Sequence, residues 1–451
     1  MPPPPPSGPP EPSGPAAPDP HGRPGSAASG AGGSPRPDAP SARRRLLVLV
    51  VPAVLAGAGA ALVLLAVSVV AGRLEDALWR ALPGALGVSG ASAPWIFGTL
   101  CATGVAVGLV VWRFPGGTGP DPATRGLIDP PLPLRVLPGV AVAVVLGLAG
   151  GVSLGPENPV TSLNIALACA LGLRALPGVP VAVWAGLAAA GTIGALFGTP
   201  VAAALVLSEA MDPRDPRPLW DRLFAPLVAA GAGAVTTVLI DAPVFAMDLP
   251  PYPGTRPADC LAALVIATAS AAVALTGAYA FPYVHGAFHR LRHPVLRLTA
   301  GGAVLGALGV LGGTLTLFKG LDQIRELAAD PAGHGPGNLA LLAVVKLAAL
   351  LVAACCGFQG GRIFPAVFTG VALGMLAHAL VPAVPLALAV TTAVLGVLLA
   401  TTRQGWLSLF VAAALAADLT LLPLLCVAAL PAWLLVTGRP VMVARPAAPG
   451  P

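Results

Sequence analysis

The chain has 451 residues, of which 56% are hydrophobic and only 10% are charged. A soluble domain typically carries about 25% charged residues, so the composition excludes an ordinary soluble protein. Apolar runs of about 20 residues recur along the sequence, and a helix of that length crosses a bilayer. We therefore predict an all-α polytopic membrane protein. The net charge of +6 is modest, and it indicates an excess of Lys and Arg on the cytoplasmic side of the membrane rather than nucleic-acid binding. The chain has only three tyrosines, which also argues against a nucleic-acid partner.

The N-terminal residues 1–42 differ from the rest, because Pro, Gly, Ser and Ala dominate them. Such a segment cannot bury enough apolar surface to fold, so we predict a disordered cytoplasmic tail. Arg43, Arg44 and Arg45 then precede the first apolar run, 46–70. Basic residues beside a first span favour the cytoplasmic side. We predict a multi-pass protein of the cell membrane with its N-terminus in the cytoplasm.

Glu157 is a carboxylate in an otherwise uncharged region. It lies in Gly-Pro-Glu-Asn-Pro at 155–159, between the uncharged stretches 139–154 and 160–173. An ionisable group at membrane depth is costly and usually functional. The flanking Gly and Pro residues break the helix, and a helix that starts inside the membrane presents N–H groups that attract anions. The pattern indicates an anion site with a gate or proton carrier beside it.

The sequence divides into two similar halves. They are predicted at 43–245 and 258–443, followed by a short tail at 444–451. Each half has a Gly/Pro-broken helix start, at 155–159 or 360–365. About forty residues later each has a turn, an apolar helix and an acid, Glu209 or Asp418. Corresponding breaks in two halves indicate the midplane site of a transporter.

Three histidines follow one another at helical spacing, His285, His289 and His293. They would share one face of a helix, but no carboxylate or cysteine lies near them in the sequence. A solvated interfacial face is therefore the favoured interpretation, and a metal site the weaker one. The six cysteines show no metal-binding spacing. We predict no metal and no organic cofactor.

Four segments resemble, in order, the CLC family of chloride channels and proton-coupled chloride transporters. They are Gly-Thr-Gly-Pro at 117–120, Gly-Pro-Glu-Asn-Pro at 155–159, Phe-Gly-Thr-Pro-Val-Ala-Ala at 197–203 with Glu-Ala-Met at 209–211, and Gly-Gly-Arg-Ile-Phe-Pro at 360–365. Lys346 stands where many members carry Lys or Arg. The resemblance covers about 46–443 and leaves no room in this chain for a nucleotide-binding CBS pair. It implies a CLC-like fold of two inverted halves with broken, tilted helices, and a homodimer.

The resemblance also implies roles for single residues. Glu157 matches the gating glutamate, which occupies an anion position when ionised and swings aside when protonated. The residues expected to bind the anion are Thr118, Gly119, Asn158, Arg362, Ile363 and Phe364. A hydroxyl, a side-chain amide, a guanidinium and N–H groups at helix starts can all donate to an anion.

The sequence departs from the family at several of these places. Pro156 replaces the usual basic residue before the glutamate, and Asn158 replaces a glycine after it. Met442 stands where the family has a chloride-coordinating tyrosine. Ala210 occupies the position of the internal proton-transfer glutamate, so the neighbouring Glu209 is the candidate proton relay. These changes favour a channel-like or loosely proton-coupled protein.

The predicted function is transport of small inorganic anions, with chloride favoured, through a lipid bilayer and with protons as candidate partners. The alternative is another secondary transporter in which Glu157 and Glu209 bind a proton or cation. That alternative needs several acids around one cavity, and only Glu157, Glu209 and Asp418 are candidates. An intramembrane enzyme is the least favoured class, because no catalytic Ser/His or Asp/Asp pair is seen in the apolar helices.

Overall fold

The computed structural model of the protein describes residues 42–240, 247–330 and 333–444. Within these ranges it is built of helices, and eight helical stretches are long and apolar enough to cross a membrane. The predicted all-α polytopic membrane fold is confirmed. The predicted tails at 1–42 and 444–451 lie outside the described residues, except for their inner ends.

The helices divide at the long connection before residue 257. Those before it are α1 (Ala42–Asp76), α2 (Leu82–Ala85), α3 (Ala93–Arg113), α4 (Leu137–Ala149), α5 (Glu157–Ala175), α6 (Val181–Phe197), α7 (Pro200–Ala210) and α8 (Leu219–Ile240). Those after it are α9 (Pro257–His289), α10 (Pro294–Gly312), α11 (Leu321–Ala329), α12 (Pro336–Cys356), α13 (Ile363–Leu380), α14 (Leu386–Thr402), α15 (Gly405–Ala416) and α16 (Leu422–Val436). Short 3-10 helices are η2 (Pro122–Thr124), η3 (Leu134–Val136), η4 (Thr314–Thr316) and η5 (Leu419–Leu421), and the π-helical turn η1 (Ala77–Ala81) joins α1 to α2.

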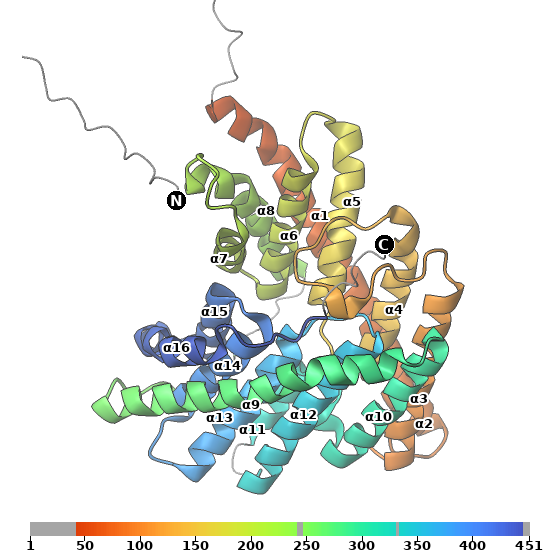
Figure 1. Ribbon diagram of the computed structural model, residues 1–451, viewed down its shortest axis with the longest axis vertical. Helices are drawn as coiled ribbons and strands as arrows, with labels where there is room; N and C mark the ends of the chain where they lie inside the picture. Colours follow the sequence, from red (N-terminus) through yellow and green to blue (C-terminus); the bar gives the residue numbers. More distant parts are fainter. Residues whose placement is uncertain (1–41, 241–246, 331–332, 445–451) are drawn as a thin grey trace, which may run out of the picture.

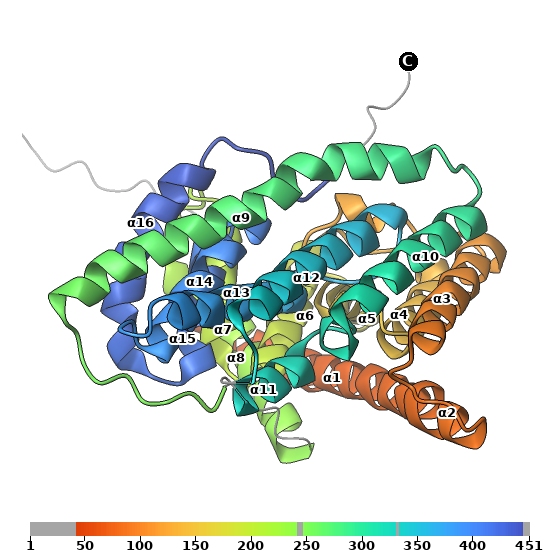
Figure 2. The same cartoon turned by 90° about the horizontal axis from the view of Figure 1, so that it is seen from below.

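The arrangement of these helices is seen in two perpendicular views (Figures 1 and 2). Helices α14, α15 and α16 form one end of the molecule, and α3, α4 and α10 form the opposite end. The long helix α9 packs on α14 and α16 and extends toward α10. Helices α5, α12 and α13 lie between the two ends. Helices α5 and α13 begin at the buried residues Glu157 and Ile363, whereas the start of α12 is exposed.

Small residues let the membrane helices approach closely. A Cβ on Gly57 of α1 would lie 2.0 Å from the carbonyl oxygen of Ala229 in α8. A Cβ on Gly191 of α6 would lie 2.6 Å from the Cα of Gly57. In lipid, helices associate through packing rather than through hydrophobic transfer, so glycine contacts of this kind carry much of the stability. They account for part of the high glycine content of the apolar segments.

The two predicted helix breaks meet inside the protein. Gly155 and Gly361 form an antiparallel bridge, in which each N–H donates to the other's carbonyl, at 2.9 and 2.7 Å. Helix α5 begins two residues after the first glycine and α13 two residues after the second. The bridge satisfies backbone groups that no helix could satisfy here, as non-helical backbone at membrane depth requires. The division into halves at 43–245 and 258–443 stays a prediction.

Lys346, an isolated charge in the apolar helix α12, is fully buried. Its ammonium donates to three consecutive carbonyl oxygens, those of Thr316, Leu317 and Phe318, at 3.1, 2.8 and 2.8 Å. Phe318 has a positive φ of 56°, and its N–H donates to the Gly151 carbonyl. The lysine therefore holds a strained loop against the segment that leads into the first helix break.

Candidate functional site

Glu157 begins α5 and is fully buried. Its side chain leaves its own helix and reaches the start of α13, where Oε1 accepts a hydrogen bond from the Ile363 N–H at 2.7 Å. The other oxygen, Oε2, is buried and has no hydrogen-bond partner in the described residues. A helix start presents unpaired N–H groups and the positive end of its dipole. The carboxylate thus lies where such a helix start would hold a free anion.

Two glycines leave the space that this carboxylate fills. A Cβ on Gly361 would lie 2.1 Å from the carboxyl carbon of Glu157, and one on Gly155 would lie 2.0 Å from Oε2. Neither glycine has a positive φ, so backbone conformation does not require glycine at either position. The requirement is room for the Glu157 carboxylate beside the paired backbones.

A very small cavity, of about 10 Å³, lies beside Asn158, and its lining comes from the segment around η2, the first turn of α5 and the loop before α13. The lining residues are Pro122, Arg125, Asn158, Pro159, Gln359 and Gly360. Gln359 is 5% exposed, and its Nε2 has no partner in the part of the chain that the structure describes. Buried donors are normally paired, so this amide is suited to an acceptor such as an anion.

Two arginines stand beside this cavity. Arg362 donates from Nη2 to the Arg125 carbonyl oxygen at 2.7 Å, while its Nη1 is buried with no partner among the described residues. Arg125 donates from Nη2 to the Ser162 hydroxyl at 2.7 Å, and its Nε lies 3.3 Å from Asp129 Oδ2. Burial lowers the pKa of the Arg125 guanidinium, and the Asp129 carboxylate opposes that shift. The Arg125 guanidinium therefore lines one side of the cavity, and the unpaired Nη1 of Arg362 is a further hydrogen-bond donor nearby.

Sequence reasoning missed Arg125 and Gln359. Arg125 lies in the polar segment between Asp121 and Asp129 and has the character of an ordinary loop charge. Gln359 directly precedes the Gly-Gly break, but an uncharged amide gives no sequence signal. Both enter the site through contacts between segments far apart in the chain.

A second pocket, which is polar and has a volume of about 240 Å³, lies beside Pro156. Its lining includes Pro156 and four charged side chains. These are Glu75, Asp76, Lys319 and Asp322. Pro156 lines this pocket and Asn158 lines the first cavity, so the two chain neighbours of Glu157 line different cavities.

Thr118 and Gly119 lie in a turn that packs against the start of α4. Thr118 is only 4% exposed. A Cβ on Gly119 would lie 3.3 Å from Leu132 and 3.7 Å from Val136. Neither residue lines the cavity beside Asn158. Their anion-binding role stays a prediction.

The segment around Met442 reaches the same loop. Met442 is fully buried, and the Ala444 N–H donates to the Ala123 carbonyl oxygen of η2 at 2.8 Å. The segment 442–444 therefore packs against the loop that contains Arg125. The thioether at position 442 offers no hydroxyl donor.

The three membrane acids do not share one site. Glu209 accepts hydrogen bonds from the N–H groups of Gly405 and Trp406 at 3.0 and 3.4 Å, and so caps the start of α15. Asp418 accepts from the Thr420 N–H at 2.9 Å and caps η5. No hydrogen bond joins either acid to Glu157 in the described part of the chain. A cation site built from the three acids together has no support in this geometry.

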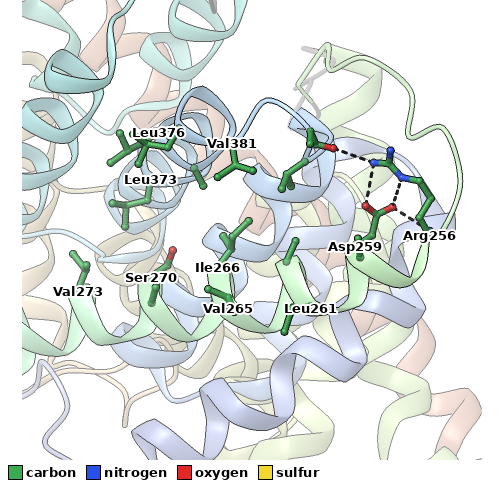
Figure 3. Close-up of a pocket in the computed structure, with 17 residues that line it drawn as sticks. Arg256, Asp259, Leu261, Val265, Ile266, Ser270, Val273, Leu373, Leu376 and Val381 are labelled. Atoms are coloured by element: carbon green, nitrogen blue, oxygen red, sulfur yellow. Dashed lines mark hydrogen bonds and ion pairs between the residues drawn. The ribbon is translucent and has the colours of Figure 1, made fainter.

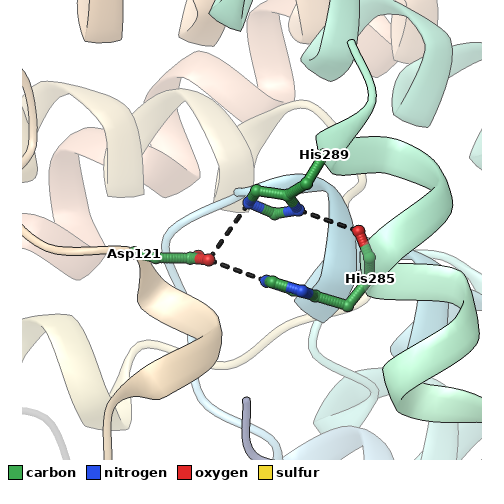
Figure 4. Close-up of side chains that lie close together, drawn as sticks. All are labelled: Asp121, His285 and His289. Atoms are coloured by element: carbon green, nitrogen blue, oxygen red, sulfur yellow. Dashed lines mark hydrogen bonds and ion pairs between the residues drawn. The ribbon is translucent and has the colours of Figure 1, made fainter. Parts of the chain in front are cut away.

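The histidines have a partner that the sequence does not reveal. No carboxylate is near it in the sequence, but the fold brings Asp121 to it, with Oδ2 2.8 Å from His285 Nε2 and 3.1 Å from His289 Nε2 (Figure 4). The sequence could not reveal this partner, because 164 residues separate Asp121 from His285. The expectation of a solvated interfacial face without a metal stays a prediction. His293 lies outside the cluster, with its ring 5.5 Å from that of Trp112.

A larger pocket lies between α9 and α13, and it is lined almost entirely by apolar side chains (Figure 3). The Arg256 and Asp259 ion pair marks its edge, with an N to O distance of 3.1 Å. Leu261 and Val265, which also line it, are 65% and 57% exposed. Such an apolar surface is suited to contact with lipid and is not suited to binding an anion.

Comparisons with known proteins agree with the fold described above. The family model described as "Voltage gated chloride channel" matches residues 103–437. A protein of Escherichia coli (strain 55989 / EAEC), "Putative ion-transport protein YfeO", is 51% identical over 400 residues, covering 89% of this chain and 96% of that protein. A CLC-type fluoride/proton antiporter structure superposes with a TM-score of 0.72 at 19% identity, over 88% of this chain and 97% of that one. A slow cyanobacterial Cl⁻/H⁺ antiporter gives 0.70 at 18% identity, over 88% and 96%.

Proposed function

Because this chain belongs to the voltage-gated chloride channel family, we propose that its ion transport is the movement of small inorganic anions past a gate formed by Glu157. Chloride is the favoured anion. The carrying observation is the 2.7 Å hydrogen bond from the Ile363 N–H to the Glu157 carboxylate. That oxygen occupies an anion position at a helix start, which is what a tethered, competing anion would do.

The surroundings of Glu157 support a gate more than a structural cap. A cap needs only its own helix start, whereas this side chain crosses from α5 to the start of α13, and its two chain neighbours line different cavities. Protonation would turn the carboxylate into a neutral acid with a weaker hold on the helix start. The freed N–H, with the unpaired donors of Gln359 and Arg362 nearby, would then hold the passing anion.

The transport activity is tested by anion efflux from proteoliposomes loaded with potassium chloride. Valinomycin supplies the compensating potassium current, and a chloride electrode records release. We expect release that depends on the protein, with fluoride, bromide and nitrate as comparison anions. Flux of a cation with no anion flux would instead favour the secondary transporter that uses Glu157 and Glu209.

We also propose that proton coupling is loose. A proton needs a second protonatable group to cross about 30 Å of hydrocarbon. Ala210 supplies none, and Glu209 is occupied with the start of α15. An imposed chloride gradient should therefore drive little proton uptake into proteoliposomes, read by an entrapped pH dye. Strong uphill proton movement that disappears in Glu209→Gln would make Glu209 the relay.

Further proposals follow from the family. We propose a homodimer in the cell membrane with the N-terminus in the cytoplasm and no enzymatic activity. Exposed leucines on α8 and α16, such as Leu239 at 80% and Leu434 at 67%, provide apolar surface for lipid or for a second copy. Cross-linking in membranes and the accessibility of an N-terminal tag test the dimer and the sidedness.

A further inference from the structure

Two histidines and an aspartate converge at the end of α9 (Figure 4). His285 and His289 are one helical turn apart, and Asp121 stands just before η2 in the loop that follows α3. Both Nε2 atoms face Asp121 Oδ2, at 2.8 and 3.1 Å, and the three ligand atoms lie within 4.8 Å of one another. Within the described residues, the cluster makes no hydrogen bond or ion pair with Glu157.

The hydrogen bonds of His289 define what its Nε2 can do. Its Nδ1 lies 2.9 Å from the His285 carbonyl oxygen, which can only accept, so Nδ1 carries the proton. In the neutral imidazole, Nε2 is then a bare lone pair. That lone pair points at a carboxylate oxygen 3.1 Å away. Two acceptors facing each other at this distance need a cation between them, either a proton or a metal ion.

We propose that Asp121, His285 and His289 bind a divalent transition-metal ion of the zinc type. Two imidazole nitrogens and one carboxylate oxygen form a known ligand set for such ions, with bonds of about 2.0–2.2 Å. A tetrahedral site with those bonds separates its ligand atoms by about 3.3 Å. The two separations from Asp121 Oδ2, 2.8 and 3.1 Å, would have to open by only a few tenths of an ångström. The stacked rings of His285 and His289 would have to turn apart so that both Nε2 atoms point at the ion.

The ligands are already oriented by their neighbours. Asp121 Oδ1 accepts from the Ala123 N–H at 3.0 Å, which turns Oδ2 toward the histidines. His289 donates its other ring N–H to a backbone carbonyl, as metal-bound histidines usually do. The ring of His285 stacks between those of Phe281 and His289, at 6.1 and 3.8 Å between centroids.

The cluster is also reachable from water. The side chains of Asp121, His285 and His289 are 24%, 20% and 27% exposed. Water can therefore deliver the ion and fill the remaining coordination position. Bound metal would tie the end of α9 to η2, the segment whose Pro122 lines the cavity beside Asn158. The site would thus join the wall of the proposed pathway to a helix at the edge of the molecule.

The test is metal binding by the purified full chain in detergent, with its cysteines alkylated beforehand. Zinc is titrated by calorimetry, and cobalt is added separately, since four-coordinate cobalt shows visible absorption bands. We expect one ion per chain. Loss of one ligand in His285→Ala or Asp121→Asn should weaken binding at least about 100-fold, because even indirect partners of a metal site are worth 10–100-fold.

His293→Ala is the matched control, because His293 follows His289 at the same four-residue spacing but lies outside the cluster. It should bind zinc as the unaltered protein does. Asp121→Asn keeps a side-chain oxygen that can accept from the Ala123 N–H, so this variant is expected to fold. It tests the proposal even if His285→Ala fails to fold. Equal zinc affinity in the unaltered chain and Asp121→Asn would overturn the proposal. The proposal would also be overturned if no zinc bound and NMR detected one imidazolium, since a proton would then lie between His289 Nε2 and Asp121 Oδ2.

Discussion

Replacing Glu157 with Gln is expected to raise anion flux about 5–10-fold at neutral pH and to remove most of its pH dependence. A hydrogen bond to a charged group contributes about 1.5–3 kcal/mol and one to a neutral group about 0.5–1.5. The glutamine side chain keeps an acceptor for the Ile363 N–H but carries no charge, so the closed state weakens by about 1–1.5 kcal/mol. Glu157→Ala removes the acceptor altogether and should open the pathway further.

The measurement is chloride efflux from proteoliposomes over a range of pH. Wild-type flux should rise as pH falls, because protonation releases the carboxylate, and the Glu157→Gln variant should stay nearly flat. Glu209→Gln is the matched control, since it makes the same change at an acid that caps α15. An unaltered pH profile in Glu157→Gln would assign Glu157 to a structural cap and remove the gate.

The sequence predicted the class of fold from simple physical limits. Long uncharged runs are long enough to cross a membrane. Clustered Gly and Pro residues break helices inside them, whereas single prolines such as Pro52 and Pro282 stay within α1 and α9. The breaks at 155–159 and 360–365 do meet, through the bridge between Gly155 and Gly361. Their meeting follows from the same rule, because broken backbone in the interior needs a partner for its hydrogen bonds.

The candidate site was only partly predictable. Glu157 was visible because a charge in an apolar region is costly, and its partner Ile363 followed from the family resemblance. Arg125 and Gln359 were not visible, since their contribution depends on a cavity that the tertiary fold creates. The contact between Arg362 and Arg125 spans 237 residues, and no local pattern encodes it.

The histidines show the same limit from the opposite direction. Their spacing placed His285 and His289 on one helix face, and the structure agrees. The missing partner, Asp121, is a capping residue of η2, and its local role as a cap explains its presence without any histidine. When a local role such as capping already explains a residue, the sequence gives no sign that the residue also makes a long-range contact.

Gly361→Ala is expected to push Glu157 off the start of α13 without altering the glutamate itself. The added methyl would lie 2.1 Å from the Glu157 carboxyl carbon and 2.3 Å from Oε1. The backbone at Gly361 has no positive φ, so alanine is tolerated there and the flexible glutamate must move. Losing a charge-assisted hydrogen bond of about 1.5–3 kcal/mol should raise flux roughly 10–100-fold at neutral pH.

Combining this change with Glu157→Ala separates the gate from the pathway. If the methyl acts only by displacing the carboxylate, Gly361→Ala adds nothing in the Glu157→Ala background, and the two changes are fully non-additive. If it lowers flux in that background, the methyl blocks the ion path itself and the expectation fails. Flux from proteoliposomes of all four proteins, at matched protein content, gives the coupling between Gly361 and Glu157. A coupling near zero would mean that the carboxylate does not close the pathway from this position.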